Sequence, residues 1–254
     1  MSRTRPPSSW RRRARQAGFT LIELMVAITV TLFMLAGVLA IYVNMKTTFV
    51  AQSNLAQLQD SERLVLTMLT TTLQSAGYFV NPLTNTATSA LPAASVTWPG
   101  GTTSAFAAGQ AVVGTGSGTG TGAASDTIAV QYQAASGDGL MNCQGGTNPA
   151  TSGAPVVWVN SFAVNNNNEL TCTVGTGAPV ALASQVASLS VLYGVDTSGS
   201  GATDTYLPAS GVTAAGLWSS VHTAQVTVTF LNTVSAAGGN GPSIVQTINF
   251  MNKP

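Results

Sequence analysis

The sequence predicts an α+β protein in which one long N-terminal helix packs on an antiparallel β-sheet head. Residues 19–76 contain no proline, and their second half has apolar residues at the spacings of one helix face. After position 78 the sequence changes to short β-branched or alternating runs separated by Gly, Ser, Thr and Asn. Hydrophobic residues make up 45% of the 254 residues and charged residues only 7%, so the chain has enough apolar side chains for a core.

A basic leader precedes the helix. It contains six of the nine basic residues of the chain: Arg3, Arg5, Arg11, Arg12, Arg13 and Arg15. Residues 24–43 then carry no charge, and 20 residues suffice for a helix to cross a bilayer. The positive-inside rule predicts a cytoplasmic N-terminus and an exported head. Since no A-x-A cleavage site follows the span, an uncut signal anchor is the simplest interpretation of the residues alone.

The start of the apolar segment carries a recognisable motif, Gly18-Phe-Thr-Leu-Ile-Glu23-Leu. It resembles the processing motif of type IV prepilins and type II secretion pseudopilins. That resemblance implies cleavage after Gly18 by a prepilin peptidase, N-methylation of Phe19, and a role in filament assembly for Glu23, the fifth residue of the mature chain.

The carboxylate of Glu23 needs an explanation because a charge inside an apolar segment is costly and usually has a partner. A paired charge is tolerated where an isolated one is not. We therefore expect Glu23 to pair with the N-terminal amine of a neighbouring subunit and so to set the register of the filament. Snorkelling of this side chain to the lipid headgroups stays an alternative, and both arrangements can hold at different stages.

Four segments follow from these patterns: the leader 1–18, a transmembrane and filament-core half of the helix at 19–45, an amphipathic half at 46–77, and a periplasmic head at 78–254. Gly77 is expected to end the helix. The amphipathic half places one apolar stripe on the head, formed by Leu55, Leu58, Val65, Leu69, Leu73 and Ala76. A long helix with such a head has the ladle shape of a type IV pilin.

The head is predicted to contain strands at 127–133, 156–164, 188–193, 225–231 and 243–251. The glycine-rich segment 114–122 lacks the Lys-Ser/Thr ending of a phosphate loop, so we interpret it as a flexible surface loop.

Cys143 and Cys172 are the only cysteines, and an exported domain favours a disulfide between them over two free thiols. His222 is the only histidine. A zinc site needs three or four Cys or His ligands. A Ser-His-Asp triad needs a histidine as its base, and a lone histidine near a strand is more often structural. We therefore expect no enzyme, no metal and no cofactor, and a structural role for His222.

Three segments narrow the resemblance to PilW-type minor pilins: Glu-Arg-Leu at 62–64, Ala-Gly-Tyr at 76–78, and Leu-Tyr-Gly-Val-Asp-Thr at 192–197 with its Gly/Ser-rich continuation. Relatives often have more aspartates in the last loop, so we considered whether this loop binds calcium. Calcium takes six to eight oxygen ligands. Here Asp196 and Asp204 are the only acids of the loop, which favours a Gly/Ser turn over a calcium site.

The resemblance implies a minor pilin, a non-enzymatic subunit that primes or caps type IV pilus assembly and supports twitching motility and adhesion. Its implied partners are the prepilin peptidase, other minor pilins, the major pilin, the assembly platform of the inner membrane and a tip adhesin. Its implied location is the inner membrane as a single-pass protein, and then the pilus fibre at or near the tip.

Two other functions stay open. One is a minor pseudopilin of a type II secretion system, which has the same architecture. The other is a ligand-binding tip subunit, either an adhesin or a DNA-capture protein. From Phe19 onward the chain has three basic and eight acidic residues, a net charge of −5, which argues against nucleic-acid binding.

Overall fold

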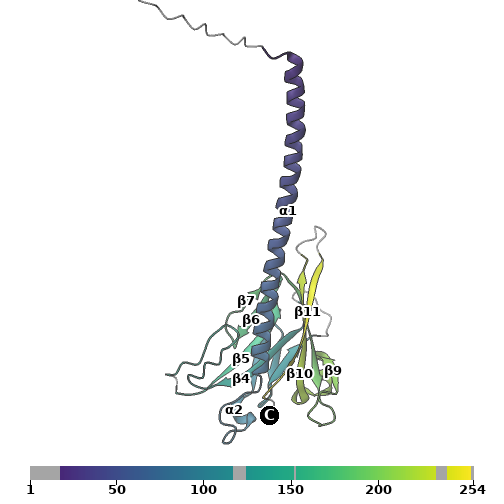
Figure 1. Cartoon of the computed structure of the whole chain (residues 1–254). Coiled ribbons are helices and arrows are strands. Elements are labelled where there is room, and N and C mark those ends of the chain that lie inside the picture. The colour runs from purple at the N-terminus through teal and green to yellow at the C-terminus, as the bar shows by residue number, and fades with distance from the viewer. Residues whose placement is uncertain (1–17, 117–123, 152, 233–238, 253–254) are drawn as a thin grey trace, which may run out of the picture. The chain divides into compact units, whose positions relative to one another are not determined.

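The structure is a computed structural model that describes residues 18–116, 124–151, 153–232 and 239–252 (Figure 1). The predicted leader, except for Gly18, and residues 117–122 of the predicted glycine-rich loop lie outside the described residues. The chain divides into two compact units, Met1–Gln52 and Ser53–Pro254, each with its own internal contacts.

One continuous helix, α1 (Leu21–Gln74), forms the N-terminal part of the described chain. The prediction of a single long helix is therefore correct, with ends two residues inside the predicted limits. Gly77 follows the helix with a φ of +79°, and its N–H donates to the carbonyl oxygen of Gln131 at 3.0 Å. A Cβ atom at this position would lie 2.4 Å from the carbonyl oxygen of Asn252. Both the conformation and the space therefore require glycine where the helix ends.

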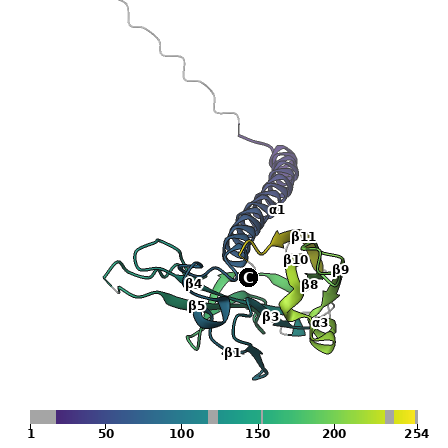
Figure 2. The same cartoon turned by 90° about the horizontal axis from the view of Figure 1, so that it is seen from below.

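The second unit contains antiparallel sheets, as predicted, so the fold is α+β (Figures 1 and 2). The larger sheet has the order β3 (Val112–Thr115), β4 (Thr127–Ala134), β5 (Val156–Val164), β6 (Leu170–Val174), β7 (Val180–Ala183). The smaller sheet has the order β11 (Asn240–Asn249), β10 (Val221–Leu231), β8 (Val186–Val195), β9 (Thr205–Pro208). A hairpin of β1 (Ala94–Thr97) and β2 (Thr103–Phe106) and three short helices complete it: α2 (Ala87–Ala90), α3 (Ala209–Ala215) and η2 (Trp218–Ser220).

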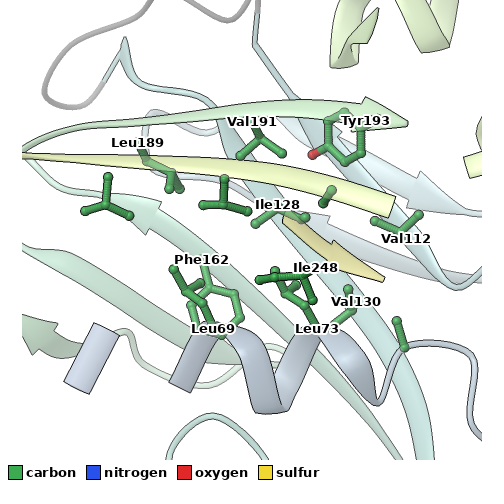
Figure 3. Close-up of a cluster of buried hydrophobic side chains, with 14 of the residues drawn as sticks. Leu69, Leu73, Val112, Ile128, Val130, Phe162, Leu189, Val191, Tyr193 and Ile248 are labelled. Atoms are coloured by element: carbon green, nitrogen blue, oxygen red, sulfur yellow. The ribbon is translucent and has the colours of Figure 1, made fainter. Parts of the chain in front are cut away.

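The core of the second unit lies where the helix meets both sheets (Figure 3). Leu69 and Leu73 are at most 1% exposed and belong to one cluster with Phe162 of β5 and Ile248 of β11. Of the predicted apolar stripe, Val65, Leu69, Leu73 and Ala76 are buried and Leu58 is partly buried. Leu55 is 49% exposed, so burial of the stripe begins later than predicted.

The two sheets are joined by hydrogen bonds between β8 and the start of β4. The N–H of Asp126 donates to the carbonyl oxygen of Leu189 at 2.9 Å, and its Oδ2 accepts the N–H of Val191 at 2.9 Å. The hydroxyl of Tyr193 donates to the carbonyl oxygen of Thr127 at 3.0 Å. Burial, and second the Asp126 charge, raise the pKa of Tyr193 well above its usual value, so the hydroxyl keeps its proton and remains a donor.

Cys143 and Cys172 form a disulfide, the pairing expected from the sequence. Both cysteines are fully buried, and the bond ties the segment between β4 and β5 to β6. The backbone N–H of Cys143 also donates to Oδ1 of Asn160 at 2.8 Å. Gln144 adds further links, since its Nε2 donates to the carbonyl oxygens of Cys172 and Ala178 at 3.1 Å each, and the disulfide is the covalent link between this segment and β6.

Replacing both cysteines, Cys143→Ala with Cys172→Ala, should lower the free energy of unfolding by about 3 kcal/mol, because a crosslink across a loop of this length restricts the unfolded chain. Denaturant unfolding of the full chain in detergent, followed by tryptophan fluorescence, measures the change. Reductant should lower the midpoint of the wild type and leave the double variant unchanged. Equal midpoints for the two proteins would contradict the prediction.

Candidate functional site

Glu23 lies in the first turn of α1 and is bound there by Thr20. The backbone N–H and the hydroxyl of Thr20 each donate to Oε2 of Glu23 at 3.1 Å, and the N–H of Glu23 donates to the hydroxyl oxygen of Thr20 at 3.3 Å. This reciprocal arrangement is a capping box. The other carboxylate oxygen, Oε1, makes no hydrogen bond within the described part of the chain. Half of the carboxylate is therefore open to a further donor.

Gly18 and Phe19 precede the helix and are exposed, Phe19 by 87%. A Cβ atom on Gly18 would meet nothing within 4 Å, and Gly18 does not have a positive φ. Among the described residues, no packing contact therefore requires glycine at position 18.

Between Leu21 and Val50, most side chains of α1 are apolar and exposed. Large hydrophobic residues from Leu21 to Val50 are roughly half exposed or more. Among the described residues, α1 is the helix that is long and apolar enough to cross a membrane, judged by length and composition. Burial of this surface is strongly favoured, so either lipid or other apolar helices should cover it. The structure thus places Gly18, Phe19 and Glu23 together at the start of an uncovered apolar helix.

The loop after β8 holds the second group of predicted residues. Oδ1 of Asp196 accepts the backbone N–H groups of Ser198, Gly199 and Ser200 at 2.7–3.2 Å. Its Oδ2 accepts the N–H of Gly201 at 2.7 Å and lies 3.7 Å from Nε2 of His222. The carboxylate of Asp196 is therefore surrounded by donors from its own loop.

Asp204 closes the same loop from its other end. Its Oδ2 accepts the N–H and hydroxyl of Thr197 at 2.8 and 3.1 Å. The N–H of Ser198 lies within hydrogen-bond distance of both carboxylates, 3.1 Å from Asp196 and 2.9 Å from Asp204. The two predicted acids are thus brought together, but through one shared donor, the N–H of Ser198.

These hydrogen bonds favour the charged form of both acids. The N–H of Gly201 does most to lower the pKa of Asp196, to about 2, against the opposing effect of burial, with further contributions from Gly199, Ser200 and Ser198. The side chain and the backbone of Ser198, followed by Thr197, lower the pKa of Asp204. The donors point at the oxygens that a calcium ion would need. The loop uses three of the four carboxylate oxygens internally, and the preference for a Gly/Ser turn over a calcium site stays a prediction.

No other group of ligating side chains appears. Within the described ranges, no three His, Cys, Asp or Glu side chains lie close enough to hold a metal ion. His222 lies beside Asp196, and its side chain is 25% exposed.

The predicted site residues did not include Thr20, and the contact of His222 with Asp196 was not predicted. The signal for Thr20 was present, because Thr-x-x-Glu before an apolar run is the pattern of a capping box. The contact between His222 and Asp196 could not be found in the same way, because it joins β10 to the end of β8 across a strand pairing that local patterns do not specify.

Two family models match the chain. The model described as Type IV Pilus-assembly protein W matches residues 149–245, which include the Asp196 loop and Cys172. The model described as Prokaryotic N-terminal methylation motif matches residues 13–39, which include Gly18, Phe19 and Glu23. No curated protein and no solved structure matches. These matches confirm the resemblance to the PilW type that the motifs indicated.

The Asp196 loop should make the head sensitive to acid. A carboxylate whose folded-state pKa lies below its unfolded value stabilises the fold above that unfolded value, and the contribution is lost as the pH falls from about 4 to about 2. Asp196→Asn should therefore lower the Tm at pH 7 and reduce the further loss of Tm on acidification. Circular dichroism melts of the full chain in detergent between pH 7 and pH 2 measure both effects.

The control is Asp60→Asn, which removes an exposed acid of α1 for which no hydrogen bond is seen. It should follow the wild-type curve. If Asp196→Asn also follows the wild-type curve at every pH, the carboxylate does not stabilise the loop.

Proposed function

Since the chain is a type IV pilin-like protein that resembles the PilW pilus-assembly proteins, we propose that it acts as a minor pilin. In this proposal it is a membrane-anchored, non-enzymatic subunit that primes or caps the pilus together with other minor pilins. The observation that carries the proposal is Glu23, a half-satisfied carboxylate at the start of an exposed apolar helix, four positions after Phe19.

Processing would come first. Prepilin peptidase would cleave after Gly18 and methylate the new N-terminus at Phe19. The exposure of both residues and the lack of any packing reason for Gly18 support this assignment, because a protease needs an accessible segment and sets its own sequence requirement. Cleavage removes the arginine-rich leader and leaves one positive charge, the amine, at the head of an apolar helix.

Assembly would follow when apolar helices pack together and cover the exposed surface of α1. The open oxygen of Glu23 would then accept the amine of a neighbouring subunit. In an apolar bundle a lone carboxylate is expensive and a hydrogen-bonded pair is tolerated, so the pair selects one axial register. Before assembly, the position of Glu23 near the end of the segment allows snorkelling to the headgroups.

The proposed location follows from the same features: single-pass insertion in the inner membrane with the N-terminus in the cytoplasm and the head in the periplasm, then transfer to the pilus near its tip. The proposed partners are other minor pilins, the major pilin, the assembly platform and a tip adhesin. The disulfide supports an oxidising compartment for the head.

A minor pseudopilin of a type II secretion system is the second candidate, because the methylation motif serves both systems. The match to a pilus-assembly family favours the pilus. Deletion of the gene distinguishes the two candidates, since loss of twitching indicates the pilus and loss of enzyme secretion indicates the secretion system.

Processing can be tested with Gly18→Ala. The wild-type protein extracted from its native envelope should begin at methylated Phe19 in intact-mass and terminal-sequence analysis. The variant should keep its leader, because the added methyl group occupies the position next to the bond to be cut. Wild-type protein that begins at any residue other than Phe19 would contradict the proposal.

The register role can be tested with Glu23→Ala. Loss of one partner of a buried pair costs about 3 kcal/mol or more, so incorporation into sheared pili should fall roughly a hundredfold while membrane insertion stays normal. Thr20→Ala is the matched control, because it removes the capping hydroxyl and leaves the carboxylate and the amine. Quantitative immunoblots of pilus and membrane fractions measure both variants.

The control separates the two roles that Glu23 can have. If the carboxylate acts through the amine of a neighbour, Thr20→Ala should assemble nearly as well as the wild type. Equal defects in the two variants would show that Glu23 serves only to cap α1, and normal assembly of Glu23→Ala would remove the register role.

A further inference from the structure

The β1–β2 hairpin creates a groove on the outer face of the larger sheet. The apolar side chains of the hairpin, Val96, Trp98 and Phe106, pack over Val113 of β3 and Ala129 of β4. Figure 2 shows β1 on the side of this sheet away from α1. The hairpin does not cover β6, whose outer face carries threonines. The space between the hairpin and β6 with the turn that follows it, here called the hairpin groove, has a volume of about 420 Å³.

Four hydroxyl groups in the hairpin groove lack protein partners. Ser95 and Thr97 line it from β1, Thr173 from β6 and Thr176 from the turn. None of these hydroxyls makes a hydrogen bond within the described part of the chain. By contrast, the buried hydroxyl of Thr171 donates to the carbonyl oxygen of Ala163 at 2.9 Å. The walls of the groove therefore offer several donors and acceptors that converge on one space.

The lining of the hairpin groove contains no charged side chain. Asn165 also lines it but is already engaged, since its Nδ2 donates to Oε2 of Glu169 at 2.7 Å and its Oδ1 accepts the N–H groups of Asn167 and Glu169. A charged ligand would lose hydration there without gaining a counter-ion. The lining instead suits a neutral molecule with many hydroxyl groups.

Both walls are fixed before any ligand arrives. Trp98 is 3% exposed, and its Nε1 donates to the hydroxyl oxygen of Ser104 at 2.8 Å across the hairpin. Strand β6 is held by the disulfide at Cys172 and by pairing with β5. Pro99 and Pro179 add rigid apolar surfaces to the lining. A preformed site binds with a smaller loss of conformational entropy.

We propose that the hairpin groove binds a neutral saccharide of one or two sugar units. The free hydroxyls of Ser95, Thr97, Thr173 and Thr176 would bond to the sugar hydroxyls, and the prolines would pack on the C–H face of the ring. The size of the groove falls in the range of small-molecule sites. This binding function is separate from the assembly function, whose residues lie in the first turn of α1.

The test uses the full chain in detergent micelles and saturation-transfer NMR with methyl glycosides of glucose, galactose and N-acetylglucosamine. Glucosamine and N-acetylneuraminic acid serve as charged comparison ligands. Thr97→Val and Thr173→Val remove one hydroxyl each and nearly conserve volume. Thr247→Val, on the exposed edge strand β11 of the other sheet, is the matched control. At least one neutral glycoside should bind the wild type and the control, and both groove variants should weaken that binding at least tenfold.

Three outcomes would overturn the proposal: no transfer to any neutral glycoside at millimolar concentration, equal binding by groove variants and control, or stronger binding of the charged sugars. Pilus incorporation of the same variants is measured in parallel and should stay normal. Loss of incorporation without sugar binding would show that the groove is a contact between subunits, which also overturns the proposal. Because Glu23 is intact in these variants, the result is independent of the assembly hypothesis.

Discussion

The head depends on the burial of one helical stripe between two sheets that share no strand pairing among the described residues. Val65, Leu69 and Leu73 are at most 1% exposed, and they belong to one cluster with residues of both sheets. Because the sheets are not continuous, their relative position comes from this shared core and from the hydrogen bonds of Asp126 and Tyr193. A rotation of the helix by one residue would turn the stripe away from both sheets at once.

The head has few cationic side chains, and this determines which groups donate hydrogen bonds to its carboxylates. Where Lys and Arg are absent, backbone N–H groups take their place as donors. Asp196 and Asp204 accept loop amides, and Asp138 accepts the N–H groups of Ala135 and Leu140 at 2.6 and 2.9 Å. Such bonds need small, flexible residues that can point several amides at one oxygen, which is why Gly and Ser accompany these acids. These three acids of the head therefore have hydrogen-bond donors without a Lys or Arg partner.

Local patterns in the sequence predicted the elements that are long and periodic. The helix, β4, β5, β8, β10 and β11 were expected within a few residues of their observed ends, because each has a strong apolar repeat. Strands β1, β2, β3, β6, β7 and β9, of four or five residues each, were missed. Segments such as Thr-Ser-Ala-Phe have no repeat long enough to detect, and they are extended only because the larger sheet and the hairpin partner hold them.

The functional residues can be divided in the same way, into those that a local sequence pattern reveals and those that it does not. The motif Gly18 to Glu23 and the two cysteines could be found from the sequence, because the one acts as a contiguous segment and the others have a single pairing available. The hairpin groove could not be found from the sequence. Its hydroxyls come from β1 and, about 80 residues later in the chain, from β6 and the turn that follows it. These hydroxyls lie together because the hairpin leaves part of the sheet uncovered. That arrangement depends on tertiary packing, which no local sequence pattern reveals.

The capping box also helps to explain how Glu23 could be accommodated in two environments, the single subunit and a bundle of helices. In the single chain, the hydroxyl and N–H of Thr20 satisfy one oxygen of Glu23, and the other oxygen has no donor among the residues that the structure describes. Near the headgroups, water can serve that oxygen at little cost, whereas in a dry helical bundle it would be left unpaired. In the proposed function, the same side chain would be stable in a single subunit at the membrane surface and would need a donor once helices surround it. Under the proposed function, this difference makes entry into the filament conditional on an amine in the correct position.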